Sequence, residues 1–192
     1  MAGHDEDPHD LRVRRATQDV WERIYAPRYA RPANVIDMRK PGEIWTMRDT
    51  PGQRRIYIIG SMRNPGVVSL TLALEAHGHE VFSDWYSPGP EADTYWQEYE
   101  QARGRTFKDA LAGPHAENVF NFDVKWLTWA DTVVLVSPAG KSAHLELGWA
   151  IGQGKEGYVL LDGEPERYDV MYRFATAVCN NEDELLAALE EG

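Results

Sequence analysis

The feature that most constrains the fold is a buried strand that runs directly into a turn and a helix, between Asp131 and Gly154. Residues 132–136 read TVVLV, an apolar and mostly β-branched run typical of a strand covered on both faces in a parallel sheet. Residues 137–140 read SPAG and end the strand, because proline removes a hydrogen-bond donor and glycine relaxes the backbone. The sequence therefore predicts a strand–turn–helix unit of a parallel α/β sheet.

The helix of this unit places an acidic side chain near its start. Apolar residues from Ala143 to Ile151 recur at helical spacing, and Ser142 is expected to cap the helix. Glu146 then falls in or near the first turn, at the carboxyl end of a strand, where open α/β sheets bind ligands. The helix N-terminus favours an ionised carboxylate there, which suits a nucleophile or a general base. An acidic residue that only complements the helix dipole would occupy the same position.

Short apolar runs alternate with helical patterns in the rest of the domain. Strands are expected at 56–59, 80–82, 158–161 and 176–179, and helices at 67–77, 115–130 and 182–190. Residues 92–111 are polar and aromatic and predict a helical region with a break at Gly104, inside an insertion of about 88–114. Strands that alternate with helices predict a doubly wound parallel sheet of flavodoxin-like or Rossmann-like order.

Residues 1–50 are predicted to be an extension of the α/β domain of residues 51–192. A short helix is expected at 11–25, Trp45 is a candidate anchor, and the acidic tip is expected to be mobile. The tip lacks the features of a signal peptide, and no apolar run approaches the roughly 18 residues of a membrane span. We therefore expect a cytoplasmic protein without a membrane partner.

Charge and cysteine usage exclude several classes of function. The 192 residues carry a formal net charge of −11, which opposes a broad contact with the phosphate backbone of duplex DNA or RNA. A single cysteine, Cys179, excludes an internal disulfide and any multi-thiolate metal site, and the six histidines lack metal-binding spacing. The residues predict no metal.

The turn after the first strand is a candidate anion site. Gly60 gives the backbone room, and Ser61 and Arg63 are suited to grip an anion at a helix N-terminus. An ordinary surface turn that contains arginine is the alternative. The spacing matches neither a P-loop nor a GxGxxG motif.

Further candidates follow the second strand and lie on the helix of residues 115–130. Asp84 could bind a sugar hydroxyl or a base, or could cap a turn, and Trp85 could select a base or belong to the core of a lid. Asp123 lies beside an apolar stripe and is either a site residue or a solvated side chain. The stripe expected to face the core consists of Val119, Phe122, Trp126 and Ala130.

Three segments together resemble one family. They read YIIGSMR at 57–63, NFDVKWLTWAD at 121–131 and HLELG at 144–148. In this order and spacing they are similar to the nucleoside 2-deoxyribosyltransferase superfamily. The branch with the most similar pattern includes the 2'-deoxynucleoside 5'-monophosphate N-glycosidases and the cytidylate hydrolases of nucleoside-antibiotic pathways.

The resemblance implies a role for each matched residue. Glu146 would be the nucleophile on the anomeric carbon and form a covalent glycosyl-enzyme. Asp123 would orient Glu146 or protonate the departing base, and Tyr57 would lie near the sugar and the nucleophile. Ser61 and Arg63 would hold a 5'-phosphate. The resemblance also implies no cofactor and a homodimer or higher homo-oligomer in which a neighbour completes the pocket.

The turn before Glu146 departs from the more glycine-rich version in the family. Ser142 could add a phosphate or sugar contact. Lys141 and His144 could read a phosphate or a base, or could face solvent. The insertion of about 88–114 and the extension have no counterpart in the minimal family fold, so the base and the sugar stay open.

The sequence therefore predicts an enzyme that cleaves or transfers the base–sugar bond of a nucleoside 5'-monophosphate or nucleoside, with hydrolysis favoured because Ser61 and Arg63 suggest a phosphate grip. Carboxylate chemistry of this kind stabilises or captures an oxocarbenium-like state. One alternative is a glycohydrolase of NAD or of a signalling nucleotide. Others are a non-catalytic nucleotide sensor and a flavodoxin-like flavin protein.

Overall fold

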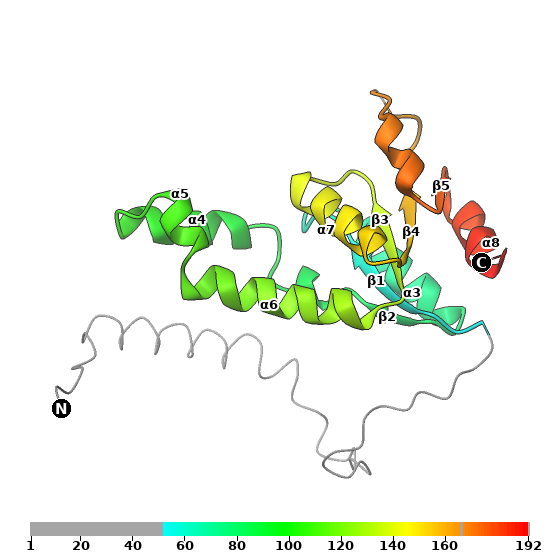
Figure 1. Cartoon of the computed structure of the whole chain (residues 1–192), viewed down its shortest axis with the longest axis horizontal. Helices are drawn as coiled ribbons and strands as arrows, with labels where there is room; N and C mark the ends of the chain where they lie inside the picture. Colours follow the sequence, from blue (N-terminus) through cyan, green and yellow to red (C-terminus); the bar gives the residue numbers. More distant parts are fainter. Residues whose placement is uncertain (1–51, 166, 192) are drawn as a thin grey trace, which may run out of the picture. The chain divides into compact units, whose positions relative to one another are not determined.

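The computed structural model describes residues 52–165 and 167–191, so the expectations for residues 1–50, including the helix at 11–25 and the anchor Trp45, lie outside the described residues. The described residues contain one five-stranded parallel sheet of order β2-β1-β3-β4-β5 (Figure 1). The strands are β1 (Arg55–Ile59), β2 (Glu80–Phe82), β3 (Thr132–Val136), β4 (Glu156–Leu160) and β5 (Ala177–Cys179). This order is the flavodoxin-like one, which confirms the predicted doubly wound α/β fold.

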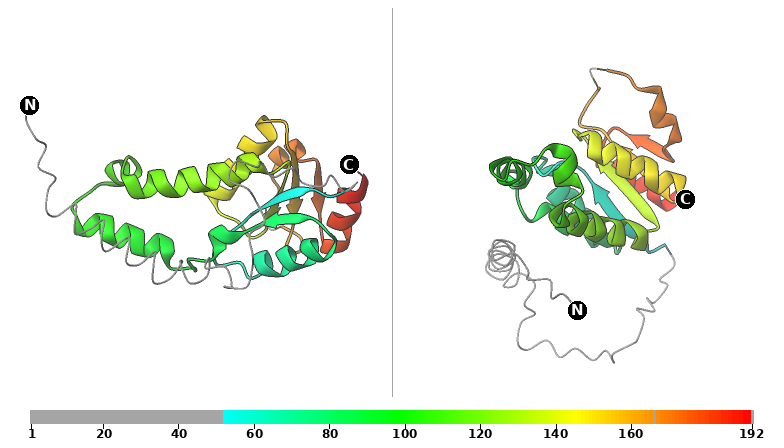
Figure 2. Two further views of the ribbon diagram at one scale, coloured as in Figure 1. Left: turned by 90° about the horizontal axis from the view of Figure 1, so that it is seen from below. Right: turned by 60° about the vertical axis from the view of Figure 1, so that its left-hand side comes forward.

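Helices cover both faces of the sheet. The described helices are α3 (Gly66–Ala76), α4 (Ala92–Ala102), α5 (Phe107–Leu111), α6 (Pro114–Trp129), α7 (Lys141–Gly152) and α8 (Glu182–Glu191), with short 3-10 helices η2 (Asp84–Tyr86) and η3 (Val170–Phe174). Residues of α3 and α8 pack on one face, and residues of α6 and α7 pack on the other (Figure 2). No described helix has both the length and the apolar character needed to cross a bilayer.

Strand β1 shows how the sequence builds the two layers. Ile56 and Ile58 pack with α3 and α8, whereas Tyr57 and Ile59 pack with α6 and α7, because successive side chains of a strand point to opposite faces. All four are at most 1% exposed. The neighbouring strand β3 is buried along its whole length, as its unbroken TVVLV run predicts.

Strand β4 begins two residues earlier than the apolar run indicated. Glu156 and Gly157 extend it because their backbones pair with Thr132 and Val133 of β3. Gly157 also lies under α7, and a Cβ atom there would come within 2.6 Å of Ile151 Cγ1. The sheet and α7 therefore touch at a distance that only glycine permits.

Helix α6 overturns one sequence prediction. Val119 and Phe122 were expected in the core, but they are 47% and 40% exposed. Figure 1 shows α6 extending beyond the sheet, with α4 and α5 beside its far half. Phe122 contacts Phe82 of β2, with ring centroids 5.8 Å apart, but stays partly exposed, and full burial begins at Leu127 and Ala130. The sheet therefore covers the periodic stripe only in part.

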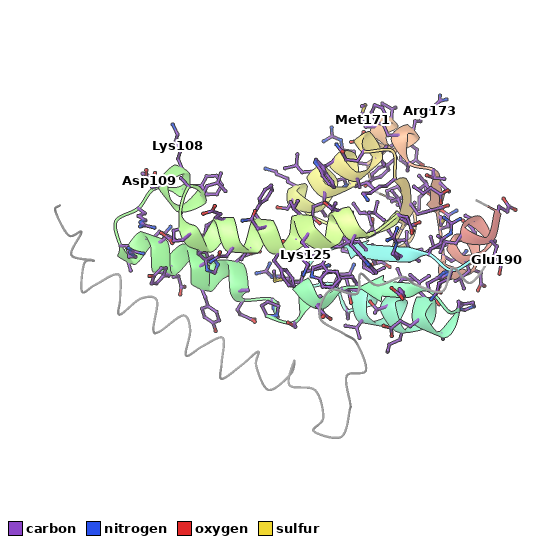
Figure 3. The ribbon with its side chains drawn as sticks, turned by 60° about the horizontal axis from the view of Figure 1, so that its bottom comes forward. Lys108, Asp109, Lys125, Met171, Arg173 and Glu190 are labelled. Carbon is purple, nitrogen blue, oxygen red and sulfur yellow. The ribbon has the colours of Figure 1, made fainter. Side chains whose placement is uncertain are left out.

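Helices α4 and α5, with the amino-terminal half of α6, form an arm. Gly104 adopts a positive φ of 70° between α4 and α5, which confirms the expected break. A capping box joins Thr106 and Asp109 at the start of α5. Figure 3 shows Lys108 and Asp109 at the end of the arm far from the strands.

Polar contacts hold the amino-terminal edge of the sheet. The Arg54 guanidinium pairs with Glu156 and donates to the Leu189 carbonyl at 2.9 and 3.1 Å. Arg55 donates from its backbone and its guanidinium to Asp131, at 3.0 and 3.1 Å. Asp131 therefore anchors the start of β3, at the edge opposite the one where ligands bind in such sheets.

Candidate active site

Three predicted site residues meet on one face of the sheet, carried by three different elements. Tyr57 lies on β1, Asp123 lies on α6 and Glu146 lies on α7. The carboxylates of Asp123 and Glu146 both raise the pKa of Tyr57, and Asp123 also raises that of Glu146, so the three groups act on one another electrostatically. The fold brings them together because β1 is flanked by β3, which joins α6 to α7.

Glu146 is partly buried and lies in the second turn of α7. Gly140 precedes the helix as its N-cap in an extended conformation, and the exposed Ser142 lies in the first turn, so the predicted Ser142 cap is wrong. The expectation that the helix N-terminus keeps Glu146 ionised is also wrong. Burial raises its pKa, and the Asp123 carboxylate raises it further, to about 7. The dipole effect fades within the first turn, which leaves desolvation dominant.

Asp123 is the second carboxyl of the site. Burial raises its pKa to about 6. Its Oδ1 atom is buried and has no hydrogen-bond partner among the described residues. An unpaired carboxylate oxygen inside a protein is costly, so this atom is open to a proton, a water molecule or a ligand donor.

Tyr57 is 1% exposed and stands at one end of an aromatic stack. Burial raises the pKa of its phenol, and then Glu146 and Asp123 raise it further, so the phenol stays protonated. Phe82 stacks on Tyr57 with ring centroids 5.6 Å apart, and Trp126 stacks on Phe82 at 4.3 Å. The indole Nε1 of Trp126 is buried without a described partner, one helical turn after Asp123. The three stacked rings hold one another in place beside the carboxyl pair.

The turn after β1 contains the predicted anion-binding residues. A Cβ atom on Gly60 would meet Val67 Cγ2 at 2.9 Å, so the backbone room expected of this glycine is required. The hydroxyl of Ser61 accepts a 3.2 Å hydrogen bond from the backbone N–H of Arg63. The Arg63 side chain is exposed, and it forms no ion pair within the part of the chain that the structure describes.

Asn64 is a buried polar residue of the same turn to which sequence analysis gave no role. It is 8% exposed, and its side-chain amide donates 2.9 Å and 3.4 Å hydrogen bonds to the carbonyls of Ser137 and Val136. Its Oδ1 accepts from the Gly66 N–H at 2.9 Å. An Asn just before a Pro-Gly pair at a helix start signals an Asx-type turn, but nothing in the sequence points to its partners at the end of β3.

The two candidates after β2 occupy different environments. Trp85 donates its indole N–H to the Ile58 carbonyl at 2.7 Å, and its ring lies 3.6 Å from the position of a Cβ on Gly60. The Trp85 N–H is therefore already satisfied by β1. Asp84 begins η2 with an exposed side chain, and partial desolvation raises its pKa. The structure gives η2 no side-chain cap.

His144 lies in the first turn of α7 and contacts the connection between β4 and β5. Its Nδ1 is 2.7 Å from the Gly140 carbonyl, so this nitrogen is the donor, and its Nε2 is 2.9 Å from the Tyr172 hydroxyl. The two rings stack with centroids 5.9 Å apart. Sequence analysis missed Tyr172, because no local pattern links positions 28 residues apart. Both ring nitrogens of His144 thus have protein partners.

The fold and these side chains define a parallel α/β protein with a pair of carboxyl groups and a buried phenol on one face of its sheet. The described residues contain no cluster of three potential metal ligands. No protein-family model matches the chain, and no curated protein matches it. Among solved structures, the chain is similar to the CMP N-glycosidase BcmB of Clostridium botulinum, with 20% sequence identity, 71% of this chain and 99% of that chain covered, and a TM-score of 0.44. The superfamily relationship rests on the three sequence segments alone and stays a prediction.

Proposed function

We propose that the protein is an N-glycosidase that cleaves the base–sugar bond of a nucleoside 5'-monophosphate. The observation that carries this proposal is the carboxyl pair of Glu146 and Asp123, whose pKa values are raised to about 7 and about 6 in a shared, partly buried setting beside Tyr57. Strongly perturbed titratable groups that act on one another are typical of catalytic sites. Two carboxyl groups are what a retaining glycosidase requires.

The proposed reaction has two steps. Glu146 attacks the anomeric carbon of the sugar, the carbon–nitrogen bond breaks, and its electron pair leaves with the base. Asp123 donates a proton to that base. Water then attacks the glycosyl–Glu146 ester, Asp123 takes a proton from the water, and the sugar 5-phosphate and free Glu146 are restored. Transfer to a second base instead of water would use the same ester.

The raised pKa values determine how many protons the two carboxyl groups share. Between the two values, near pH 6 to 7, the pair as a whole holds about one proton. Because Glu146 has the higher pKa, it holds this proton more often than Asp123, and the reactive form is the less populated one, in which the proton lies on Asp123 and Glu146 is ionised. The pair thus supplies the acid and the nucleophile together, as coupled carboxyl groups in other enzymes do.

Tyr57 is proposed to donate a hydrogen bond rather than to act as a base. Burial and the two carboxylates disfavour the phenolate, so the hydroxyl retains its proton throughout the pH range in which the carboxyl groups titrate. A fixed neutral donor beside the nucleophile stabilises charge that changes during the reaction. It also sets the position of the sugar.

Recognition of the phosphate is assigned to the turn after β1. Arg63 presents an exposed guanidinium and Ser61 a partly buried hydroxyl within the same turn. A guanidinium is suited to bidentate contact with phosphate oxygens. This turn leaves the carboxyl end of β1, the edge where open α/β sheets bind ligands.

We also propose a homodimer. Leu145 and Trp149 lie on α7 beside Glu146 and are 75% and 39% exposed. A second copy of the chain would remove this apolar surface from water and would lie close to the carboxyl pair. Light scattering on the purified full chain should give twice the monomer mass, whereas a monomer at micromolar concentration would contradict the proposal.

The function is tested by incubating the protein with ribo- and deoxyribonucleosides, their 5'-monophosphates and NAD, beside Glu146→Gln, and measuring free base by chromatography. Base release from monophosphates that is lost in the variant is the expected result. Nicotinamide release from NAD alone would favour a glycohydrolase of signalling nucleotides. Binding of nucleotides without any base release, even with an added acceptor base, would replace catalysis with a sensor function.

A further inference from the structure

The side chain of Asn64 joins two turns that leave neighbouring strands at the carboxyl edge of the sheet. Its NH2 group donates to the carbonyls of Val136 and Ser137, where β3 ends. Its Oδ1 atom accepts from the N–H of Gly66, where α3 begins. One amide therefore connects the turn of residues 60–66 with the turn of residues 137–140.

These two turns serve different parts of the proposed site. The first carries Ser61 and Arg63, which are assigned to the phosphate. The second leads through Gly140 into α7, which carries Glu146. The hydrogen bonds of Asn64 therefore set the distance between the proposed phosphate-binding side chains and Glu146.

The packing around Asn64 leaves little freedom for the two turns to shift. A Cβ atom on Gly66 would come within 3.0 Å of Asn64 Oδ1 and 3.5 Å of Val136 Cγ1. The Asn64 backbone also accepts from Val67 N at 3.3 Å and donates to the Ser61 carbonyl at 2.8 Å. Asn64 is therefore held on both its side-chain and its backbone groups.

Asn64 also changes how an anion can bind at this turn. The first N–H groups of α3 already have acceptors: Gly66 donates to Asn64 Oδ1, and Val67 and Val68 donate to the carbonyls of Asn64 and Pro65. Free N–H groups at a helix start are the usual donors to a phosphate. With these groups occupied, the grip falls to the side chains of Ser61 and Arg63, whose position depends on the turn.

We propose that Asn64 is a positioning residue that sets the distance between the phosphate-binding turn and Glu146, so that binding of the phosphate brings the anomeric carbon to the nucleophile. The inference rests on the proposed function. It requires that the contribution of Asn64 to turnover depends on the substrate phosphate.

The test compares Asn64→Asp with the wild type on a nucleoside 5'-monophosphate and on the matching nucleoside. The aspartate retains an oxygen for the Gly66 N–H, but it turns a second oxygen toward the carbonyls of Val136 and Ser137. We expect kcat/KM on the monophosphate to fall about tenfold or more, since small displacements of a positioned substrate are costly, while kcat/KM on the nucleoside changes little. Asn64→Ala removes the hydrogen bonds of both the amide oxygen and the amide nitrogen, and it should also lower kcat/KM on the monophosphate more than on the nucleoside.

Tyr158→Phe is the matched control, because it also removes a partly buried side-chain hydrogen bond. The Tyr158 hydroxyl donates to Glu156 Oε2 at 3.0 Å, close to the amino-terminal edge of the sheet. This variant should keep the wild-type preference for monophosphate over nucleoside. Equal losses on both substrates in Asn64→Asp would mean a merely structural role and would overturn the inference.

A double-mutant cycle with Arg63→Ala separates positioning from general destabilisation. If Asn64 acts through the phosphate grip, the pair Asn64→Asp and Arg63→Ala should lose little more than Arg63→Ala alone on the monophosphate. Additive losses would contradict the inference. If the wild type releases no base from any nucleotide, the proposed function fails, and the same cycle is measured on monophosphate affinity by calorimetry. If the losses of binding free energy in the two single variants add up in the double variant, or if the wild type does not bind the monophosphate, the inference is overturned as well.

Discussion

Burial raises the pKa of Glu146, and the Asp123 carboxylate on the neighbouring helix α6 raises it further, to about 7. A carboxyl group of this kind destabilises the folded protein once it ionises, because the unfolded chain can solvate the charge. The same group is the proposed nucleophile. Stability and activity are therefore opposed at this residue, as is common for catalytic groups.

Replacing Glu146 with glutamine should separate these two effects. Below the unfolded pKa of about 4.5 the group is protonated in both states, and between about 4.5 and about 7 the folded wild type binds more protons than the unfolded chain, so its stability falls as pH rises. Glu146→Gln should therefore gain about 1–3 kcal/mol over the wild type at pH 8 and almost nothing at pH 4. Base release should fall about a thousandfold or more.

Denaturant melts of both proteins at pH 4 and pH 8, together with the chromatographic assay, measure these outcomes. Glu164→Gln is the control, because Glu164 lies in the connection after β4 and its carboxylate accepts a hydrogen bond from the exposed Tyr168. A Glu146→Gln protein that is less stable than the wild type at pH 8 would show that the carboxylate is not desolvated as described.

The pH dependence of kcat/KM should be bell-shaped, with a maximum between about 6 and about 7. Below this window both carboxyl groups are protonated and no nucleophile is present. Above it both are ionised and no acid protonates the base. The profile should be recorded on a nucleoside, because a substrate phosphate itself titrates near pH 6. A rate that keeps rising to pH 9 would exclude Asp123 as the acid.

Replacing Arg63 with alanine should weaken binding of the phosphate. Loss of a charge-assisted contact predicts a kcat/KM for the monophosphate that falls about 10- to 100-fold. The matching nucleoside should be cleaved as by the wild type. Lys108→Ala is a suitable control, because Lys108 lies at the far end of the arm (Figure 3). Equal losses on both substrates would remove Arg63 from phosphate recognition.

Replacing Tyr57 with phenylalanine should lower kcat about 100-fold, the usual effect of losing one fixed donor at a reacting centre. The stack on Phe82 should persist, since the ring is retained. Because Tyr57 contributes no charge to the carboxyl pair, the shape of the pH profile should not change. A shift of the profile by a whole pH unit would show instead that Tyr57 acts by tuning the pair.

Strand positions could be predicted closely where side chains carry the signal. The run TVVLV defined β3 to the residue, because its ends are marked by a charged residue and by Ser-Pro. The start of β4 was missed because Glu156 and Gly157 join the sheet through their backbones. The periodicity of α6 was read correctly as a helix, but periodicity does not report how much of a helix the sheet covers, so the exposed Val119 and Phe122 were placed in the core.

The candidate site could be predicted in its residues but not in its electrostatics. Family-like segments pointed to Tyr57, Asp123 and Glu146, and the fold brings these three side chains near one another. Their burial is a property of packing between α6, α7 and β1, so the direction of the Glu146 shift was predicted wrongly. The roles of Asn64 and Tyr172 depend on partners 73 and 28 residues away, which no local pattern encodes.

The close approach of Gly157 to α7 bears on how such a protein can diversify. Any side chain at position 157 would push against Ile151 and Leu147, which lie on the same helix as Glu146. Selection is expected to remove variants with a larger residue at position 157, unless the side chains of α7 that face it become smaller in the same lineage. New substrate preferences would then arise in the connections at the edge of the sheet, while the geometry between sheet and nucleophile is inherited unchanged.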